Sequence, residues 1–279
     1  MTNPGYPASR QPLNRRTDLR FRLMQLLHFG YQQAMSCLFP VTIFLVLFGS
    51  RILPLPWLDR YDWILLALLA AQALMLLGKV ETWDECKVIF VFHLIGLALE
   101  LYKTHMGSWS YPEEAWSKLF GVPLYSGFMY ASVASYLCQA WRRLRVELVG
   151  WPNDKLAAAL SLAIYLNFFT HHYLPDFRWL LILLVFVVFW KSKAVYTVRN
   201  ATYSMPLAAS FLLIGLFIWL AENIATFYGA WQYPNQQASW QPVGLGKISS
   251  WYLLVIISFI IVAYLKHTKA RRDKKPANR

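Results

Sequence analysis

Long stretches of apolar residues dominate this chain and limit the folds that it can adopt. A helix that crosses a bilayer needs about 20 largely apolar residues, and eight stretches approach this length. They cover residues 31–50, 57–78, 86–103, 121–142, 155–173, 177–196, 204–224 and 246–266. Charged residues make up only 15% of the chain, against about 25% in soluble domains. The sequence therefore predicts an all-α, polytopic membrane protein with about eight transmembrane helices.

The positive charges alternate along the chain in step with these predicted helices. With the N-terminus in the cytoplasm, the cytoplasmic segments would hold 21 of the 27 Lys and Arg residues. The six on the outer side would be Arg51, Arg60, Lys103, Lys118, Arg178 and Lys247. This asymmetry is the positive-inside rule, and it predicts that both termini are cytoplasmic. The net charge of +13 is then a topology signal, so we expect membrane lipids as partners and no nucleic acid.

One pattern occurs twice, 122 residues apart. Residues 100–112 (ELYKTHMGSWSYP) align without a gap with residues 222–234 (ENIATFYGAWQYP), and six of the thirteen positions are identical. The same offset places Tyr130 on Tyr252, and it superposes the first four predicted helices on the last four. An even number of crossings gives both copies the same orientation, related by an axis along the membrane normal. The sequence thus predicts two tandem four-helix repeats.

This duplication divides the chain into four parts. A basic cytoplasmic segment, residues 1–30, precedes the first repeat at 31–150, and a basic tail, 267–279, follows the second repeat at 151–266. The sequence does not predict an oligomeric state.

Each copy of the repeated pattern begins with a glutamate near the end of an apolar run. A carboxylate costs free energy there unless it has a partner or a function. Glu100 and Glu222 either reach the headgroup region as helix ends or face the interior of the bundle as general acid and base, or as a proton relay. His93 precedes Glu100 by two helical turns and shares its face, so we include it with the catalytic candidates.

Aromatic residues follow each glutamate at the same spacing. Trp109 and Tyr111 in the first copy match Trp231 and Tyr233 in the second. Tryptophan and tyrosine commonly form belts at the membrane interface, but such belts do not explain a constant distance from a glutamate. We therefore predict that these four side chains and Asn223 bind substrate. The long connections that contain them are expected to fold back as caps over the outer ends of the helices.

The repeated Glu…Gly-x-Trp-x-Tyr-Pro pattern, together with eight spans, resembles an uncharacterised bacterial integral-membrane family, domain of unknown function 817. The resemblance covers roughly residues 20–270 and brings no activity with it. It implies a multi-pass protein of the bacterial inner membrane.

A more distant similarity is to small membrane-embedded lycopene cyclases and related carotenoid-synthesis membrane proteins. These also duplicate a helical unit and place a Gly-x-Trp-aromatic segment shortly before a Gly-x-Pro, as residues 107–111 precede residues 121–123 here. The cyclases carry two glutamates directly after that Gly-x-Pro, as candidate acids. This chain has Leu124 and Tyr125 at those positions, and Tyr125 joins the predicted substrate-binding residues.

Three classes of function stay open from the sequence. The first is an intramembrane enzyme that modifies a lipid, an isoprenoid or another apolar small molecule. The second is a small proton-coupled transporter, and the third is a non-catalytic membrane scaffold. The sequence has no HExxH motif, no paired cysteines and no phosphate-binding glycine loop, so it predicts neither a metal nor a cofactor.

Overall fold

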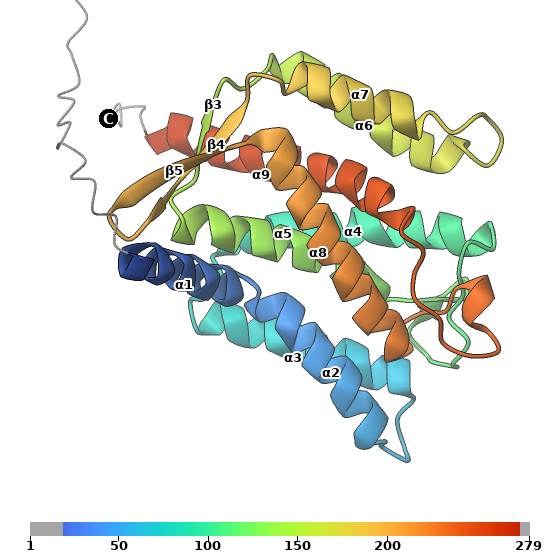
Figure 1. Cartoon of the computed structure of the whole chain (residues 1–279). Helices are drawn as coiled ribbons and strands as arrows, with labels where there is room; N and C mark the ends of the chain where they lie inside the picture. Colours follow the sequence, from blue (N-terminus) through green and yellow to red (C-terminus); the bar gives the residue numbers. More distant parts are fainter. Residues whose placement is uncertain (1–18, 274–279) are drawn as a thin grey trace, which may run out of the picture.

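Helices make up most of the structure, as the apolar stretches predict. The computed structural model describes residues 19–273 (Figure 1). The predicted basic segments 1–30 and 267–279 lie only partly inside this range, and both chain ends lie outside it. The described helices are α1 (Leu19–Ser36), α2 (Leu38–Ile52), α3 (Arg60–Leu77), α4 (Trp83–His105), α5 (Ser126–Arg143), α6 (Asp154–Thr170), α7 (Arg178–Val188), α8 (Leu207–Phe227) and α9 (Lys247–Asp273), with a 3₁₀ turn at Pro234–Gln236.

Three helices are individually long and apolar enough to cross a membrane. They are α3, α8 and the part of α9 that ends at Leu265. The pair α1 and α2 meets the same test when taken together, which gives up to four candidate spans. A mostly helical protein is therefore confirmed, with three to four candidate membrane spans among the described residues.

The predicted helix at 31–50 is instead broken into α1 and α2. The two helices meet at Cys37 and are bent by 61°. Proline has no N–H group, so Pro40 cannot donate the helical hydrogen bond to the carbonyl of Ser36. The missing bond explains why a continuous apolar stretch folds as a bent pair.

The predicted helix at 177–196 was wrong in its second half. Helix α7 ends at Val188, and β4 (Lys193–Val198) pairs antiparallel with β5 (Ala201–Pro206). Three of the six residues of β4 are β-branched, which favours a strand, and Arg199 adopts a φ of 53° in the turn. Strand β5 also takes the first residues of the predicted helix at 204–224.

Short strands add small sheets to the helices. Strand β3 (Glu147–Val149) pairs with β4, giving the order β3-β4-β5. Strands β1 (Lys118–Leu119) and β2 (Val122–Pro123) form a two-stranded ladder. This ladder lies where the helix at 121–142 was predicted to begin, so α5 starts later, at Ser126.

Two helix pairs form the centre of the protein. Helix α4 packs against α5, α8 packs against α9, and α9 also contacts α4 and α5. In Figure 1, α6 and α7 lie on one side of this centre, α1, α2 and α3 lie on the other, and α8 crosses in front. Glycines permit the close approach. A Cβ on Gly127 would lie 2.7 Å from the His93 carbonyl oxygen, and one on Gly215 would lie 2.9 Å from the Tyr252 amide.

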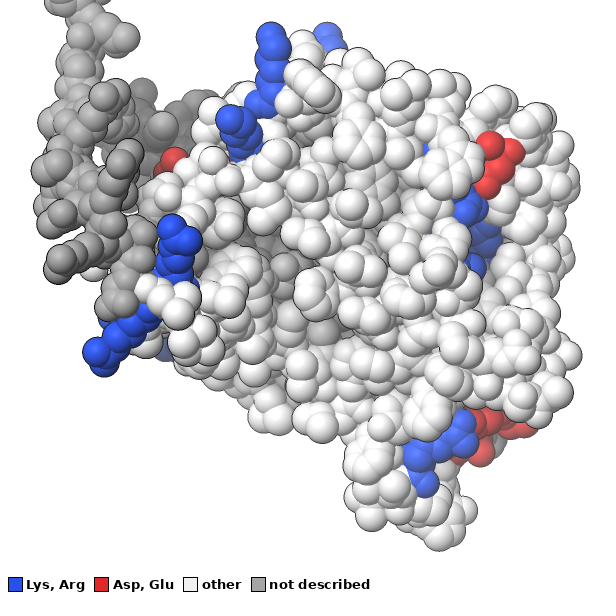
Figure 2. Space-filling view, in the orientation of Figure 1, with Lys and Arg blue, Asp and Glu red and all other residues white. Residues whose placement is uncertain are grey.

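Charged residues gather at two ends of the face shown in Figure 2, with a broad uncharged band between them. Hydrogen bonds join the connections at each end. At one end, Gln139 donates to the Val80 carbonyl and Thr197 donates to the Leu144 carbonyl. At the other end, Arg51 donates to the Tyr228 carbonyl over a sequence distance of 177 residues. The helices therefore run between two distinct polar surfaces.

Candidate functional site

The two long connections predicted to act as caps contact each other over one end of the bundle. They cover residues 106–125 and 228–246. Ser110 and Gln232 form an antiparallel bridge in which each amide donates to the other's carbonyl at 2.9 Å. The Tyr125 hydroxyl donates to the Ala230 carbonyl and joins the same two segments. The caps thus form one layer.

Arg60, the first residue of α3, fixes this layer to the helices. Its guanidinium donates to the Glu113 carboxylate at 2.6 Å in the first cap. It also donates to the carbonyls of Tyr228 at 2.5 Å and Gly229 at 3.1 Å in the second cap. A planar guanidinium can hold several acceptors in a fixed geometry, so one side chain positions both caps.

Glu100, near the end of α4, is buried, with 5% exposure. Its Oε2 accepts hydrogen bonds from Trp109 Nε1 at 2.6 Å and from the Tyr111 hydroxyl at 2.7 Å. Its Oε1 accepts from the Tyr130 hydroxyl of α5 at 2.8 Å. The repeated spacing therefore folds the aromatic residues of the first cap back onto the glutamate.

Glu222, near the end of α8, is buried in a related way, with 3% exposure. Its Oε1 accepts from the Tyr233 hydroxyl at 2.5 Å, and its Oε2 accepts from Trp251 Nε1 of α9 at 2.8 Å. Tyr233 follows Glu222 by eleven residues, the separation of Tyr111 from Glu100. The tryptophan donor differs, because it comes from a helix and not from the cap.

The tyrosine hydroxyls of the two caps keep their protons over the ordinary pH range. Burial raises the pKa of Tyr111 well above its usual value, and the neighbouring Glu100 carboxylate raises it further. Burial and Glu222 raise the pKa of Tyr233 in the same way. Both hydroxyls therefore remain hydrogen-bond donors to the carboxylates.

Glu100 and Glu222 line the same cavity, which has a volume of about 110 Å³. Trp109, Trp231 and Tyr233 line it as well. The site residues predicted from the repeat therefore come largely from two distant segments and meet at one place. The cavity is large enough to hold several water molecules or a small polar group.

Three cationic side chains also line this cavity: Lys103, Arg178 and Lys247. Lys247 Nζ lies 5.2 Å from the ring centre of Trp109 and 4.5 Å from that of Tyr233. These distances are typical of cation–π contacts. Lys247 thus contacts one aromatic residue from each cap.

Lys103 is the most buried of the three cations, with 4% exposure. Its Nζ lies 3.3 Å from both ring nitrogens of His171 and 3.1 Å from Nε2 of His172. Arg178, at the start of α7, forms an ion pair with Asp176 at 3.0 Å. The connection between α6 and α7 therefore supplies the third wall of the cavity.

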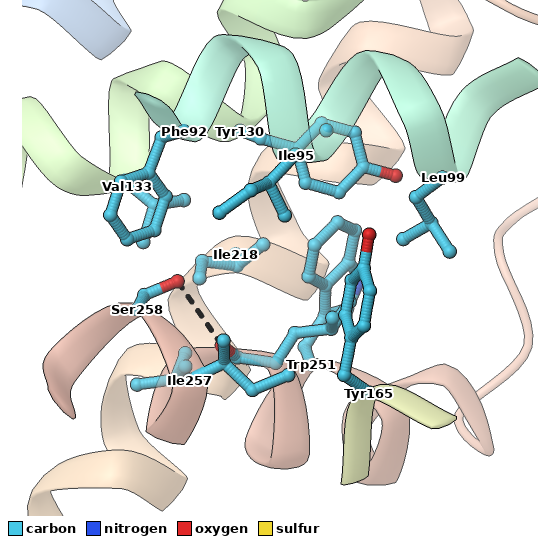
Figure 3. A pocket seen from close by; sticks show the side chains of 13 residues that line it. Phe92, Ile95, Leu99, Tyr130, Val133, Tyr165, Ile218, Trp251, Ile257 and Ser258 are labelled. Carbon is cyan, nitrogen blue, oxygen red and sulfur yellow. Dashed lines mark hydrogen bonds between the residues drawn. The ribbon is translucent and has the colours of Figure 1, made fainter. Parts of the chain in front are cut away.

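A second, apolar cavity of about 30 Å³ adjoins the first (Figure 3). The two share four lining residues, Leu99, Tyr130, Trp251 and Leu254. The rings of Tyr130 and Trp251 lie 6.3 Å apart, and these two side chains donate to Glu100 and Glu222 respectively. The boundary between the polar and the apolar cavity is thus formed by donors to both carboxylates.

Four predicted residues do not line the cavity, and Tyr111 reaches it only through its hydrogen bond to Glu100. The His93 ring packs against Phe128 at 4.7 Å, and its buried Nδ1 has no partner among the described residues. Asn223 Oδ1 accepts from the Val243 amide at 2.9 Å, and it thereby anchors the second cap. Tyr125 is fully buried in the layer of caps.

The lining residues missed from the sequence include three cations and two aromatic donors: Lys103, Arg178, Lys247, Tyr130 and Trp251. Two signals could have found some of them. The 122-residue offset aligns Tyr130 with Tyr252, and the three cations are half of the six Lys and Arg residues predicted on the outer side. Nothing in the sequence indicates that these cations converge.

Comparisons with known proteins identify relatives of this chain but no activity. An uncharacterised protein of Bacillus subtilis (strain 168), YoaT, is 62% identical over 253 residues, which cover 91% of this chain and 96% of that protein. A crystal structure of a cross-linked MvINS trimer covers 67% of this chain and 95% of its own, with 11% identity and a TM-score of 0.47. A family model described as "protein of unknown function (DUF817)" matches residues 25–259. The chain therefore belongs to the DUF817 family.

Proposed function

We propose that this chain is an integral protein of the bacterial inner membrane with eight crossings, the bent pair α1–α2 counting as one. The uncharged band in Figure 2 supports this topology, as do the connections that meet alternately at the two ends. Helix α7, with 11 residues, is about 16 Å long, so its crossing would need a locally thinned bilayer. The basic segments lie on the cytoplasmic side with both termini.

The eight crossings form two repeats, residues 31–150 and 151–266. Three observations support this division. Ser110 and Gln232, which bond to each other, are 122 residues apart. The bonds from Tyr111 to Glu100 and from Tyr233 to Glu222 obey the same offset. The packing of α4 on α5 has its counterpart in the packing of α8 on α9.

The protein binds a lipid- or isoprenoid-type amphiphile at the junction of the two repeats and transfers protons at its polar end. One observation carries this proposal. The cavity lined by both buried glutamates adjoins an apolar cavity between α4, α5, α6, α8 and α9. An amphiphile has the same division into a polar head and an apolar chain.

Glu100 and Glu222 act as general base and general acid in this proposal. Both carboxylates are positioned by neutral donors, Tyr111 and Trp109 on one side and Tyr233 on the other. Fixed donors of this kind orient a carboxylate for proton transfer. The aromatic faces at the boundary would also stabilise positive charge that develops on an isoprenoid.

Lipid and isoprenoid extracts of expressing cells test the enzyme class. We expect the wild-type protein to change the profile relative to an empty vector, and we expect Glu100→Gln and Glu222→Gln to abolish that change. Glu147→Gln, in exposed strand β3, is the matched control and should behave as wild type. A wild-type profile identical to that of the empty vector would contradict enzymatic activity on these lipids.

A proton-coupled transporter is less well supported by the site. Transporters commonly bind substrate where helices are broken near the middle of the membrane. Helices α4 and α8 continue without a break through Glu100 and Glu222, and the described break at Cys37 belongs to α1–α2, which supply no lining residue. The lycopene cyclase resemblance and the scaffold function stay predictions from the sequence.

A further inference from the structure

We propose that the polar cavity recognises an anionic, phosphate-type group through Lys103, Arg178 and Lys247. This inference rests on the proposed function, because it specifies the head of the amphiphile. It goes beyond that proposal by stating the charge of the ligand's head group. It assigns recognition of that charge to three cations that do not belong to the six identical positions of the repeated pattern.

The distribution of cations is the first argument. Six Lys and Arg residues are predicted on the outer side, where the positive-inside rule keeps their number low. Three of them line this cavity of about 110 Å³. The others have structural partners within the caps: Arg51 and Arg60 bind carbonyls of the second cap, and Lys118 donates to the carbonyls of Tyr111 and Glu113.

The surroundings of Lys103 are the second argument. A buried ammonium group loses its hydration and requires an anion or several acceptors in compensation. Among the described residues, the polar partners of Lys103 Nζ are imidazole nitrogens of His171 and His172, and no carboxylate oxygen lies within 4.0 Å. An anion in the cavity would complete this site.

The carboxylates of the two glutamates do not serve as this anion. The oxygens of Glu100 and Glu222 accept hydrogen bonds from five aromatic donors. Lys247 contacts the rings of two of these donors, Trp109 and Tyr233, and forms no ion pair within 4.0 Å in the described part of the chain. The cations and the two carboxylates thus line one cavity, and among the described residues none of the three cations forms an ion pair with Glu100 or Glu222 within 4.0 Å.

A phosphate group fits the three cations better than a neutral head group does. Lysine provides a point charge for phosphate, and arginine binds its oxygens in a forked geometry. Arg178 also donates to Ser249 Oγ at 3.2 Å, at the start of α9, so its guanidinium is held beside Lys247. Glu100 and Glu222 line the same cavity, so a phosphate bound there would lie beside the groups proposed to transfer the proton.

Binding of matched ten-carbon probes to the purified full-length protein in detergent tests this inference. The probes are decyl phosphate, decanol, decyltrimethylammonium and inorganic phosphate. We expect decyl phosphate to bind at least tenfold more tightly than decanol or decyltrimethylammonium. Inorganic phosphate should bind more weakly than decyl phosphate, because it lacks the chain; equal affinity would identify free phosphate as the source of the anion.

Lys103→Met and Arg178→Gln should each raise the Kd for decyl phosphate at least tenfold and leave the Kd for decanol unchanged. Lys87→Met is the matched control, because Lys87 lies on the same helix with a side chain that is 75% exposed. Should Lys103→Met fail to fold, Lys247→Gln at the half-buried third cation gives the same readout. Equal affinities for decyl phosphate and decanol would overturn the anionic site alone, whereas no binding of any ten-carbon probe would overturn the proposed function as well.

Discussion

The two glutamates occupy matched places in the sequence, but their surroundings differ. Glu100 accepts three hydrogen bonds, from Trp109, Tyr111 and Tyr130. Glu222 accepts two, from Tyr233 and Trp251. The matched tyrosine is kept, and the other donors have changed. Under the proposed duplication, the position of the carboxylate is retained while its degree of restraint has diverged, and Glu222 is the less restrained of the two.

Removal of each carboxylate is the strongest test of this difference. Glu100→Ala leaves three buried donors without an acceptor, and each loss costs about 1–3 kcal/mol. Because the cavity can admit water, we expect about 3 kcal/mol for Glu100→Ala and about 2 kcal/mol for Glu222→Ala. Thermal unfolding in detergent should show the lower Tm for Glu100→Ala. Equal Tm values would mean that the two sites are equivalent in stability.

The two cap tyrosines provide a smaller and more selective test. Tyr111→Phe leaves Glu100 with two donors, whereas Tyr233→Phe leaves Glu222 with Trp251 alone. We expect a loss of about 1 kcal/mol for Tyr111→Phe and about 2 kcal/mol for Tyr233→Phe. The order is thus opposite to that of the alanine variants. Tm measurements under the same conditions provide the check, and Tyr31→Phe, at an exposed tyrosine of α1, is a suitable control.

Substitution of Asp176 should have the smallest effect. Asp176 has no acidic counterpart in the first half of the chain, because the residue 122 positions earlier is Pro54. Burial acts to raise the pKa of Asp176, but hydrogen bonds from Asn167 and the Arg178 amide outweigh it and hold the pKa below its usual value. The stability that Asp176 contributes is therefore present above the unfolded pKa of about 4 and is lost as the pH falls through the folded value.

Asp176→Asn should accordingly lower the free energy of unfolding at neutral pH by less than about 0.5 kcal/mol, because the ion pair is partly exposed. The Tm should fall slightly as a result. The difference in Tm between wild type and variant should shrink as the pH is lowered below about 4. A difference that grows on acidification would contradict the assignment.

The sequence predicted the parts of the fold that depend on local pattern. Most apolar stretches became helices within a few residues of the expected bounds, because burial of apolar side chains and the length of a helix are encoded locally. The break at Cys37 depends on a single proline, and the end of α7 depends on the pairing of β4 with the adjacent β5 and with the distant β3. Apolar content alone does not reveal either feature.

The same limit applies to the site. The spacing of Trp109 and Tyr111 from Glu100 pointed to a real contact, because both lie in a segment that folds back on its own helix. Lys103 and Lys247 lie 144 positions apart and meet only through the packing of α4 against α9. His93 faces the same neighbouring helix as Glu100, yet it packs against Phe128 outside the cavity, since sharing a helical face does not place two side chains in one cavity.

The bridge between Ser110 and Gln232 has a consequence for the origin of such a chain. Each of the two residues donates to and accepts from its own counterpart, which is the reciprocal geometry of an isologous contact between identical subunits. A contact of this kind requires no difference between the partners. If the two halves are repeats, as proposed, two copies of a half-length ancestor could have formed it across a twofold axis before a gene fusion joined them into one polypeptide.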